Sequence, residues 1–258
     1  MASPRTQRHS WISVSPKYVG SSTIFLASPF FTHAFRDLAT VVRSGSPIPD
    51  NPGIEQEVPI LVDFAHGMGP IMYPVAEQVA KLLGNMVDAK ILDVASGHGL
   101  FGIAVAKQNP TATIVALDFP SALAVGKDNA RRFGVGKQYS LLPGDALVVS
   151  FGGGFEAILV PNLLHHWDRS TIRDFLQKAY FALKPGGRIV VVEFAPNDDR
   201  IFPPIPASFA LIMLANTSGG DAYTSSELVA ILQDAGFKHC ESKTLLPSPQ
   251  SVIVAVKK

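Results

Sequence analysis

The chain has 258 residues, of which 47% are hydrophobic, and its 22 Lys and Arg residues almost balance 21 Asp and Glu residues. This length and composition allow one large buried core and do not match a disordered segment. Because Lys and Arg are scattered and the formal charge is only +1, a nucleic-acid-binding protein, which needs a concentrated basic face, is not expected. The expected partner is a small molecule.

Cys240 is the only cysteine, so the sequence predicts no disulfide framework and no thiolate metal site. Its apolar surroundings predict a buried structural thiol. No apolar run reaches the ~18 to 20 residues that a membrane-spanning helix needs, and the polar first residues lack the apolar core of a secretory signal. A cytoplasmic protein without membrane contacts is therefore expected.

The first 84 residues are expected to divide into two parts. Residues 1–54 are rich in Ser, Pro and Gly and predict an irregular N-terminal arm with one short helix at about residues 30–42. Residues 55–84 predict one or two connecting helices, broken by Pro70 and Pro74, that pack on the following domain. Their apolar residues recur at helical spacing: Ile60, Phe64, Met68, Ile71, Val75, Val79 and Leu82.

Residues 85–258 alternate between strand and helix patterns, which predicts an α/β domain with a doubly wound, mostly parallel sheet. The short turn at residues 245–250 cannot make a parallel crossover, so the two strands that it joins should be antiparallel. Seven strands are expected, at residues 91–94, 113–117, 139–142, 157–160, 188–194, 239–244 and 251–256.

Two helices of this domain carry clear end signals. Residues 172–183 show one apolar face, and the Lys184-Pro-Gly-Gly187 run should end that helix. Thr224 and Glu227 form a capping box that opens the last helix, with Gly236 at its end. Glu227 is thus better explained as a helix cap than as a catalytic acid.

The most informative motif is Gly97-x-Gly99-x-x-Gly102 between a strand and a helix. Such a loop can approach a nucleotide closely, so a dinucleotide, S-adenosylmethionine or a structural turn without ligand are all open. Asp93 precedes the loop, and a carboxylate there would repel a pyrophosphate but attract the ammonium of S-adenosylmethionine. Asp118 ends the next strand, where an acid can accept hydrogen bonds from ribose hydroxyls. S-adenosylmethionine is the favoured ligand.

Acidic and basic side chains should meet this loop at one edge of the sheet. His165 and His166 follow the fourth strand, and an imidazole can remove a proton at neutral pH; His165 is the favoured base, with a packed structural histidine as the alternative. Glu193 could orient that histidine, or simply face solvent. Asp145, followed by Ala146, could meet an adenine, or serve only the turn after Gly144.

Together these residues resemble the catalytic domain of S-adenosylmethionine-dependent O-methyltransferases of the caffeate and acetylserotonin type, and more closely their bacterial secondary-metabolite relatives. The resemblance covers about residues 55–258 and implies a Rossmann-like fold. It implies that His165 is the general base, with Glu193 as its acid. The implied donor-binding residues are Asp93, Gly97, Gly99, Asp118, Phe119, Gly144, Asp145 and Ala146, and the implied acceptor pocket contains Phe64, Met68, His166, Trp167 and Met213.

The chain departs from the plant enzymes at three places. Ala222 stands where they have a second glutamate, which leaves His165 with Glu193 alone or with Asp221. Pro161-Asn162 replaces their Lys-Trp pair and resembles methyltransferases that also act on carbon. Their N-terminal winged-helix dimerisation domain is not expected ahead of residue 55, so the apolar face at residues 64–75 is expected to associate, in a weakened or altered homodimer.

The expected activity is methyl transfer to a hydroxyl of a small aromatic or polyketide-like acceptor. Carbon methylation of a similar molecule is one alternative, because alignment alone can suffice there. A second alternative is a truncated relative that binds the donor with little or no catalysis.

Overall fold

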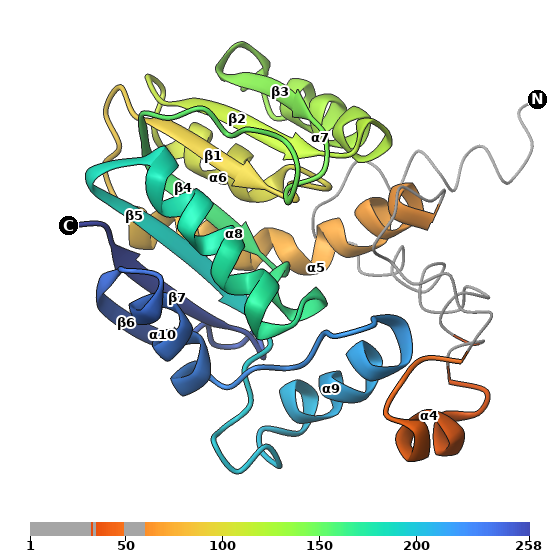
Figure 1. Cartoon of the computed structure of the whole chain (residues 1–258). Coiled ribbons are helices and arrows are strands. Elements are labelled where there is room, and N and C mark those ends of the chain that lie inside the picture. Colours follow the sequence, from red (N-terminus) through yellow and green to blue (C-terminus); the bar gives the residue numbers. More distant parts are fainter. Residues whose placement is uncertain (1–31, 33–34, 49–59) are drawn as a thin grey trace, which may run out of the picture.

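The computed structural model describes residue 32, residues 35–48 and residues 60–258 (Figure 1). Most of the predicted N-terminal arm lies outside these residues. Its described part contains helix α4 (Leu38–Ser44), which starts later than the predicted helix at residues 30–42. Asp37 caps α4 by accepting a hydrogen bond from the Thr40 N–H at 3.2 Å, and Gly45 ends it in a left-handed conformation. Local capping, rather than apolar spacing, fixes these bounds.

The seven predicted strands form one sheet. The strand order is β3-β2-β1-β4-β5-β7-β6, so the order reverses between β1 and β4. A ligand site is expected outside the carboxyl ends of these two strands. The bounds are β1 Lys90–Val94, β2 Thr113–Asp118, β3 Tyr139–Pro143, β4 Phe155–Pro161, β5 Leu183–Glu193, β6 Lys238–Thr244 and β7 Ser251–Val256.

Strands β3, β2, β1, β4 and β5, neighbours in this order, are all parallel, and β7 runs antiparallel to both β5 and β6. The predicted antiparallel end of the sheet is therefore confirmed. β5 begins earlier than expected, because the Lys184–Gly187 run belongs to the strand instead of separating it from the helix. Two backbone hydrogen bonds hold this run to Lys257 beyond β7: Gly186 N–H donates to Lys257 O at 2.8 Å, and Lys257 N–H donates to Gly187 O at 2.9 Å.

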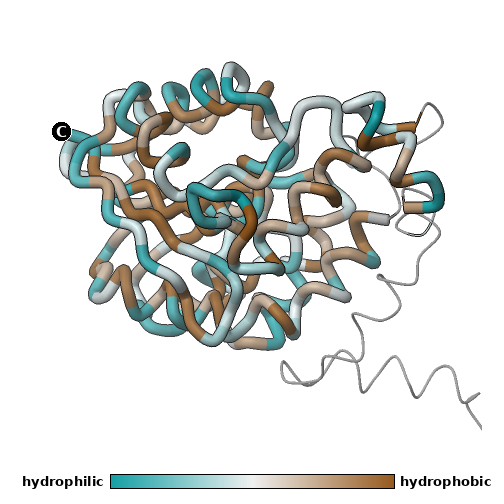
Figure 2. The backbone as a smooth tube through the Cα atoms, turned by 90° about the horizontal axis from the view of Figure 1, so that it is seen from below, coloured by the Kyte–Doolittle hydropathy of each residue, from teal (hydrophilic) through white to brown (hydrophobic). Residues whose placement is uncertain are grey.

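Helices cover both faces of the sheet, and each face has its own apolar core. One face carries α5 (Ile60–Leu83), α6 (Leu100–Gln108) and α7 (Pro120–Arg132), and the other carries α8 (Arg169–Ala182) and α10 (Ser225–Asp234). Figure 2 shows hydrophobic residues along the central strands and hydrophilic ones mainly at the outer turns. The short helix α9 (Pro204–Asn216) lies beside α4 at the edge of this sandwich.

The connecting segment is one continuous helix, so the break expected at Pro70 and Pro74 was wrong. Proline removes one backbone donor and crowds the preceding turn, which costs about 3 kcal/mol in an exposed helix. Here the helix packs against α6, and Val75, Ala76 and Val79 are buried. Burial of that apolar face offsets the local cost.

The capping box of α10 is confirmed: Thr224 Oγ1 accepts from Glu227 N–H at 3.2 Å, and Glu227 Oε2 accepts from Thr224 N–H at 2.8 Å. Cys240 corrects another expectation, because its side chain is only half-buried on the edge strand β6. Partial burial raises the pKa of its thiol. Within the described residues, no helix combines the length and apolar character needed to cross a bilayer.

Candidate active site

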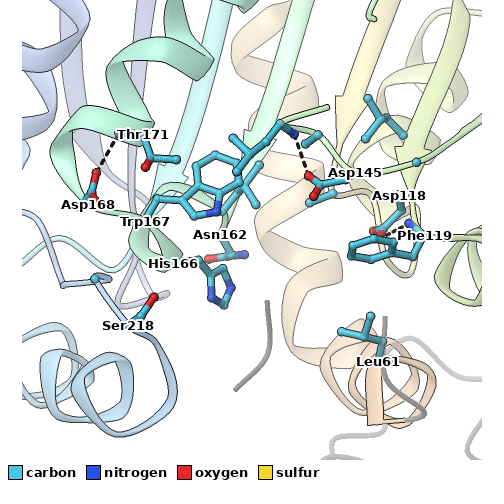
Figure 3. Close-up of a pocket in the computed structure, with 17 residues that line it drawn as sticks. Leu61, Asp118, Phe119, Asp145, Asn162, His166, Trp167, Asp168, Thr171 and Ser218 are labelled. Carbon is cyan, nitrogen blue, oxygen red and sulfur yellow. Dashed lines mark hydrogen bonds between the residues drawn. The ribbon is translucent and has the colours of Figure 1, made fainter. Parts of the chain in front are cut away.

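A cavity of about 390 Å³ opens at the carboxyl ends of the central strands (Figure 3). It lies where the strand order reverses, as expected for a doubly wound sheet. The side chains of Asp118, Phe119 and Asp145 border one end, and Trp167 and His166 border the other. The remaining residues that line it are Leu61, Ala95, Leu117, Gly144, Ala146, Leu147, Asn162, Leu163, Asp168, Thr171, Ser218 and Gly219.

The glycine loop is tied to the end of β2 by Asp118. Its Oδ2 accepts a hydrogen bond from Gly97 N–H at 2.7 Å, and its Oδ1 accepts one from Phe119 N–H at 2.7 Å. Gly97 and Gly99 both have positive φ, and a Cβ on Gly99 would lie 2.5 Å from the Tyr139 hydroxyl. The loop conformation therefore requires glycine there. Gly97 and Gly99 shape the loop but are not among the residues that line the cavity.

Asp93 lies behind this loop instead of in the cavity lining. Its carboxylate is fully buried, and its Oδ2 accepts from Gly102 N–H at 2.9 Å. Its Oδ1 has no hydrogen-bond partner among the residues the structure describes. Burial, with a smaller effect of the Asp118 charge, raises the pKa of Asp93 to about 7. Asp93 can thus act on a ligand only indirectly, by holding the glycine loop in place or through the electric field of its own carboxylate.

The predicted adenine side of the site does line the cavity, namely Gly144, Asp145 and Ala146, together with Phe119. Asp145 Oδ1 accepts from Leu147 N–H at 2.7 Å, so the aspartate also stabilises its own turn. Gly144 has a φ of 148°, and its N–H donates to Asp118 O at 3.0 Å. This bond places the two acidic turns side by side at the cavity.

The histidine segment after β4 is organised by Glu193, which ends β5. Glu193 Oε1 accepts from the N–H groups of Leu163 at 3.0 Å and Leu164 at 2.8 Å. Its Oε2 lies 2.5 Å from His165 Nδ1. Glu193 is 3% exposed, so the alternative of a charged strand end facing solvent was wrong. The structure thus brings His165 and Glu193 together in the geometry of an oriented base.

The segment between α9 and α10 supports His165 from behind. Asp221 N–H donates to His165 O at 3.0 Å, and a Cβ on Gly220 would lie 2.2 Å from that oxygen. The Asp221 carboxylate accepts from Arg200 Nη1 at 2.8 Å instead of reaching the imidazole. Ala222, where the plant enzymes have an acid, is buried. In the described part of the chain, the carboxylate that contacts His165 is that of Glu193.

Phe209 of α9 packs edge-on against His165, with ring centroids 4.8 Å apart, and stacks on Phe194. The sequence did not predict this contact, because Phe209 lies in a proline-rich apolar segment without a clear period. His165 itself is buried and does not line the cavity, whereas His166 does. Burial, and to a lesser degree the neighbouring His165, hold the pKa of His166 well below its usual value.

Of the predicted acceptor pocket, the structure brings only His166 and Trp167 to this cavity. Phe64 and Met68 lie on α5 outside its lining, and Met68 packs against the core beneath that helix. Met213 is buried within α9. Helical spacing could not show that Met68 and Met213 pack in the interior rather than line this cavity.

Asn162 is a site residue whose position the sequence indicated without assigning it a role. It lines the cavity with a φ of 55°, and its backbone N–H donates to Val192 O at 2.8 Å. Its Oδ1 accepts a hydrogen bond from the fully buried Gln250, and its Nδ2 lies 3.5 Å from Met72 Sδ. Other lining residues that the sequence did not assign to the site include Leu61, Asp168, Thr171 and Ser218. Asp168 and Thr171 share the first turn of α8, where Asp168 caps the helix by accepting from Thr171 N–H at 2.8 Å, whereas Leu61 and Ser218 come from distant segments.

Comparison with known families decides where this arrangement belongs. The model of the O-methyltransferase domain family matches residues 55–238. The chain belongs to this family. A relative from Streptomyces sahachiroi, 3-hydroxy-5-methyl-1-naphthoate 3-O-methyltransferase, is 27% identical over 75% of this chain and 56% of its own length.

Solved structures of the family share the fold. A Nostoc punctiforme protein, named provisionally as an O-methyltransferase, is 42% identical, has a TM-score of 0.89, and is matched over 94% of this chain and 73% of its own. Human N-acetylserotonin methyltransferase in complex with SAM has a TM-score of 0.80 at 21% identity, over 95% of this chain and 72% of its own. The chain spans about half to two thirds of the length of three curated relatives that it matches.

Proposed function

We propose that this O-methyltransferase-family chain transfers a methyl group from S-adenosylmethionine to a hydroxyl of a small aromatic or polyketide-like molecule. The observation that carries the proposal is the buried His165–Glu193 pair, with Nδ1 and Oε2 2.5 Å apart, directly beside the cavity that the acidic turns border. Hydroxyl methylation requires a base with an oriented lone pair next to a site that holds the methyl donor and the acceptor.

The residues around the cavity fit the donor chemically. Asp118 lines the cavity at the end of β2 and accepts two backbone N–H groups, and an acid at this place in the fold can also accept hydrogen bonds from ribose hydroxyls. Phe119 and Ala146 line the cavity and would offer apolar surface to the adenine ring, while Asp145 would accept a hydrogen bond from its amino group. A cation bound beside the loop would favour the ionised form of Asp93, and the negative charge of this carboxylate would in turn favour the cation.

Bound S-adenosylmethionine would supply an electrophilic methyl group. The chain's own task is then to hold the acceptor in line and to remove its proton. His165 Nε2 would accept this proton, because Nδ1 faces the Glu193 carboxylate. Glu193 would stabilise the resulting imidazolium while three neighbouring backbone N–H groups keep the carboxylate in place.

Relatives support the acceptor class. The Streptomyces sahachiroi relative is named as an O-methyltransferase of a hydroxynaphthoate, and a relative from Streptomyces cremeus is named as 3-amino-4-hydroxybenzoate 4-O-methyltransferase. Carbon methylation is less favoured, since it does not need the His165–Glu193 pair. We also propose that the protein is cytoplasmic, binds no nucleic acid and forms a weakened or altered homodimer.

The proposal is tested with purified 258-residue protein, radiolabelled S-adenosylmethionine and a panel of phenols and naphthols. We expect methyl ethers as products, and a loss of about 10² or more in kcat for His165→Ala. His239→Asn is the matched control, because His239 is exposed on β6 and asparagine tolerates its positive φ. Tight binding of S-adenosylhomocysteine in calorimetry without any transfer would instead support a donor-binding relative, and ring-methylated products would support carbon methylation.

A further inference from the structure

His166 presents an imidazole to the cavity beside His165. The two ring centroids are 4.4 Å apart, and the rings are inclined by 50°. In Figure 3 the His166 ring extends from the end of the β4 segment, near Asn162, toward the open space of the pocket. His166 thus lies between the cavity and the neighbourhood of His165, with its ring in contact with the His165 ring.

The two nitrogens of His166 have different surroundings. Nδ1 is buried and has no hydrogen-bond partner in the part of the chain that the structure describes. The residue as a whole lines the cavity, so the edge open to a ligand is the one that carries Nε2. The ring is neutral at pH 7, since its pKa lies well below the usual value. A neutral imidazole carries its proton on only one of these two atoms.

Burial decides which nitrogen holds this proton. A buried N–H without an acceptor is rarer and more costly than an acceptor nitrogen that lacks a donor. The proton of His166 therefore belongs on Nε2, where it can bond to a ligand. In His165 the situation is reversed, because the Glu193 carboxylate 2.5 Å from Nδ1 requires the proton on Nδ1 and leaves the Nε2 lone pair free.

We propose that the two adjacent histidines hold opposite tautomers, and that His166 is an N–H donor that recognises an oxygen beside the methylated hydroxyl. The acceptor class is then an aromatic ring whose reacting hydroxyl has a neighbouring carbonyl, carboxylate or ether oxygen. His166 is a specificity-determining residue and not a second base, because its lone pair is shut off from the cavity. This inference rests on the proposed function for the identity of the reaction.

The tautomers can be measured without any activity. Long-range ¹H–¹⁵N NMR spectra of the ¹⁵N-histidine-labelled 258-residue protein at pH 7.5 distinguish protonated from unprotonated ring nitrogens. Signals are assigned with His165→Gln and His166→Gln. We expect protonated Nδ1 in His165 and protonated Nε2 in His166. A protonated Nδ1 in His166 would overturn the proposal, even if the protein transfers methyl groups.

Recognition is tested with 2-methoxyphenol and 4-methoxyphenol, which differ in whether the ether oxygen lies beside the hydroxyl. We expect the native protein to have the higher kcat/KM for 2-methoxyphenol. His166→Phe keeps a ring without the donor, and the ratio of the two values should fall about tenfold, as for loss of one hydrogen bond. His166→Gln keeps an N–H near the Nε2 position and should restore most of the preference, whereas His239→Asn should leave it unchanged.

Different results would overturn the recognition role of His166 and the proposed methyl transfer. An unchanged isomer ratio in His166→Phe would overturn the recognition role while methyl transfer itself continues. Absence of transfer to every phenol would contradict the proposed function, and the NMR spectra would still decide the tautomers. A preference for 4-methoxyphenol in the native protein would also overturn the inference.

Discussion

Replacing Glu193 by Gln tests the link between burial and catalysis most directly. The amide keeps the size of the side chain, and its oxygen can still accept the backbone N–H groups of Leu163 and Leu164. Its NH₂ group, however, would face His165 Nδ1 across the present 2.5 Å contact. Two donors would then oppose each other unless the imidazole moves its proton to Nε2.

The expected loss follows from that change of tautomer. With the proton on Nε2, His165 has no lone pair for the acceptor hydroxyl, and a general base is worth about 10²–10⁴ in rate. Loss of the carboxylate charge also removes a charge-assisted hydrogen bond to the imidazolium, worth about 1.5–3 kcal/mol. We expect kcat to fall by about 10³, which corresponds to roughly 4 kcal/mol in the activation barrier.

The assay measures initial rates of methyl transfer at saturating S-adenosylmethionine, together with calorimetric affinity for S-adenosylhomocysteine. Affinity for the latter should change little, because Glu193 is not among the residues that line the cavity. Glu227→Gln is the matched control, since Glu227 caps α10 and pairs with Arg200 and Arg169 away from His165. A Glu193→Gln protein that keeps kcat within threefold of the native value would refute the reasoning.

Three further predictions concern stability and the support of the site. The pKa of Asp93 is about 7 in the folded protein against 3.8 for an ordinary carboxyl, so the folded state holds the proton of Asp93 more tightly than the unfolded state does. The stability that this adds is fully present at pH 3 and is lost as the pH rises from 4 to 7. In the native protein this fall in the free energy of unfolding spans roughly 4 kcal/mol; Asp93→Asn should flatten it and should raise stability at pH 8. Urea unfolding at pH 5 to 8 without ligand measures the effect, and an unchanged dependence of the free energy of unfolding on pH would contradict it. Gly220→Ala places a Cβ 2.2 Å from His165 O and should lower kcat at least tenfold and the melting temperature by several degrees, whereas Gly153→Ala, with 3.8 Å to its nearest neighbour, should do neither. Thr224→Ala removes the cap of α10 and should cost about 1 kcal/mol in urea unfolding without changing kcat; equal stability would show that Glu227 alone holds the helix start.

Much of the sheet could be predicted because its signals are local. Apolar runs of strand length, separated by helical patterns, gave the seven strands, and the short turn before β7 gave their antiparallel end. The capping box at Thr224 was equally readable, since its two hydrogen bonds join residues three positions apart. Where local and tertiary forces opposed each other, as at Pro70 and Pro74, the local signal misled: burial of the α5 face outweighs the missing donors.

In the candidate site, too, the features with a local sequence signal could be predicted and the contacts between distant segments could not. The residues of the glycine loop and the acidic turns could be found in the sequence because a close backbone approach needs glycine and because strand ends carry the ligand-facing acids. The supporting contacts could not be found: Phe209 on His165, Gln250 on Asn162 and Gly220 behind His165 join segments tens of residues apart.

By itself, then, the sequence determined the order of strands and helices, the loop that can approach a nucleoside and the identity of the histidine and its acid. Only the tertiary structure decided which atoms face which. It placed Asp93 behind the loop, locked His165 Nδ1 onto Glu193, and turned the neighbouring His166 toward the cavity. The physical reason is that chain-local spacing fixes backbone direction, whereas burial and hydrogen-bond partners, contributed by distant segments, fix the position of a proton.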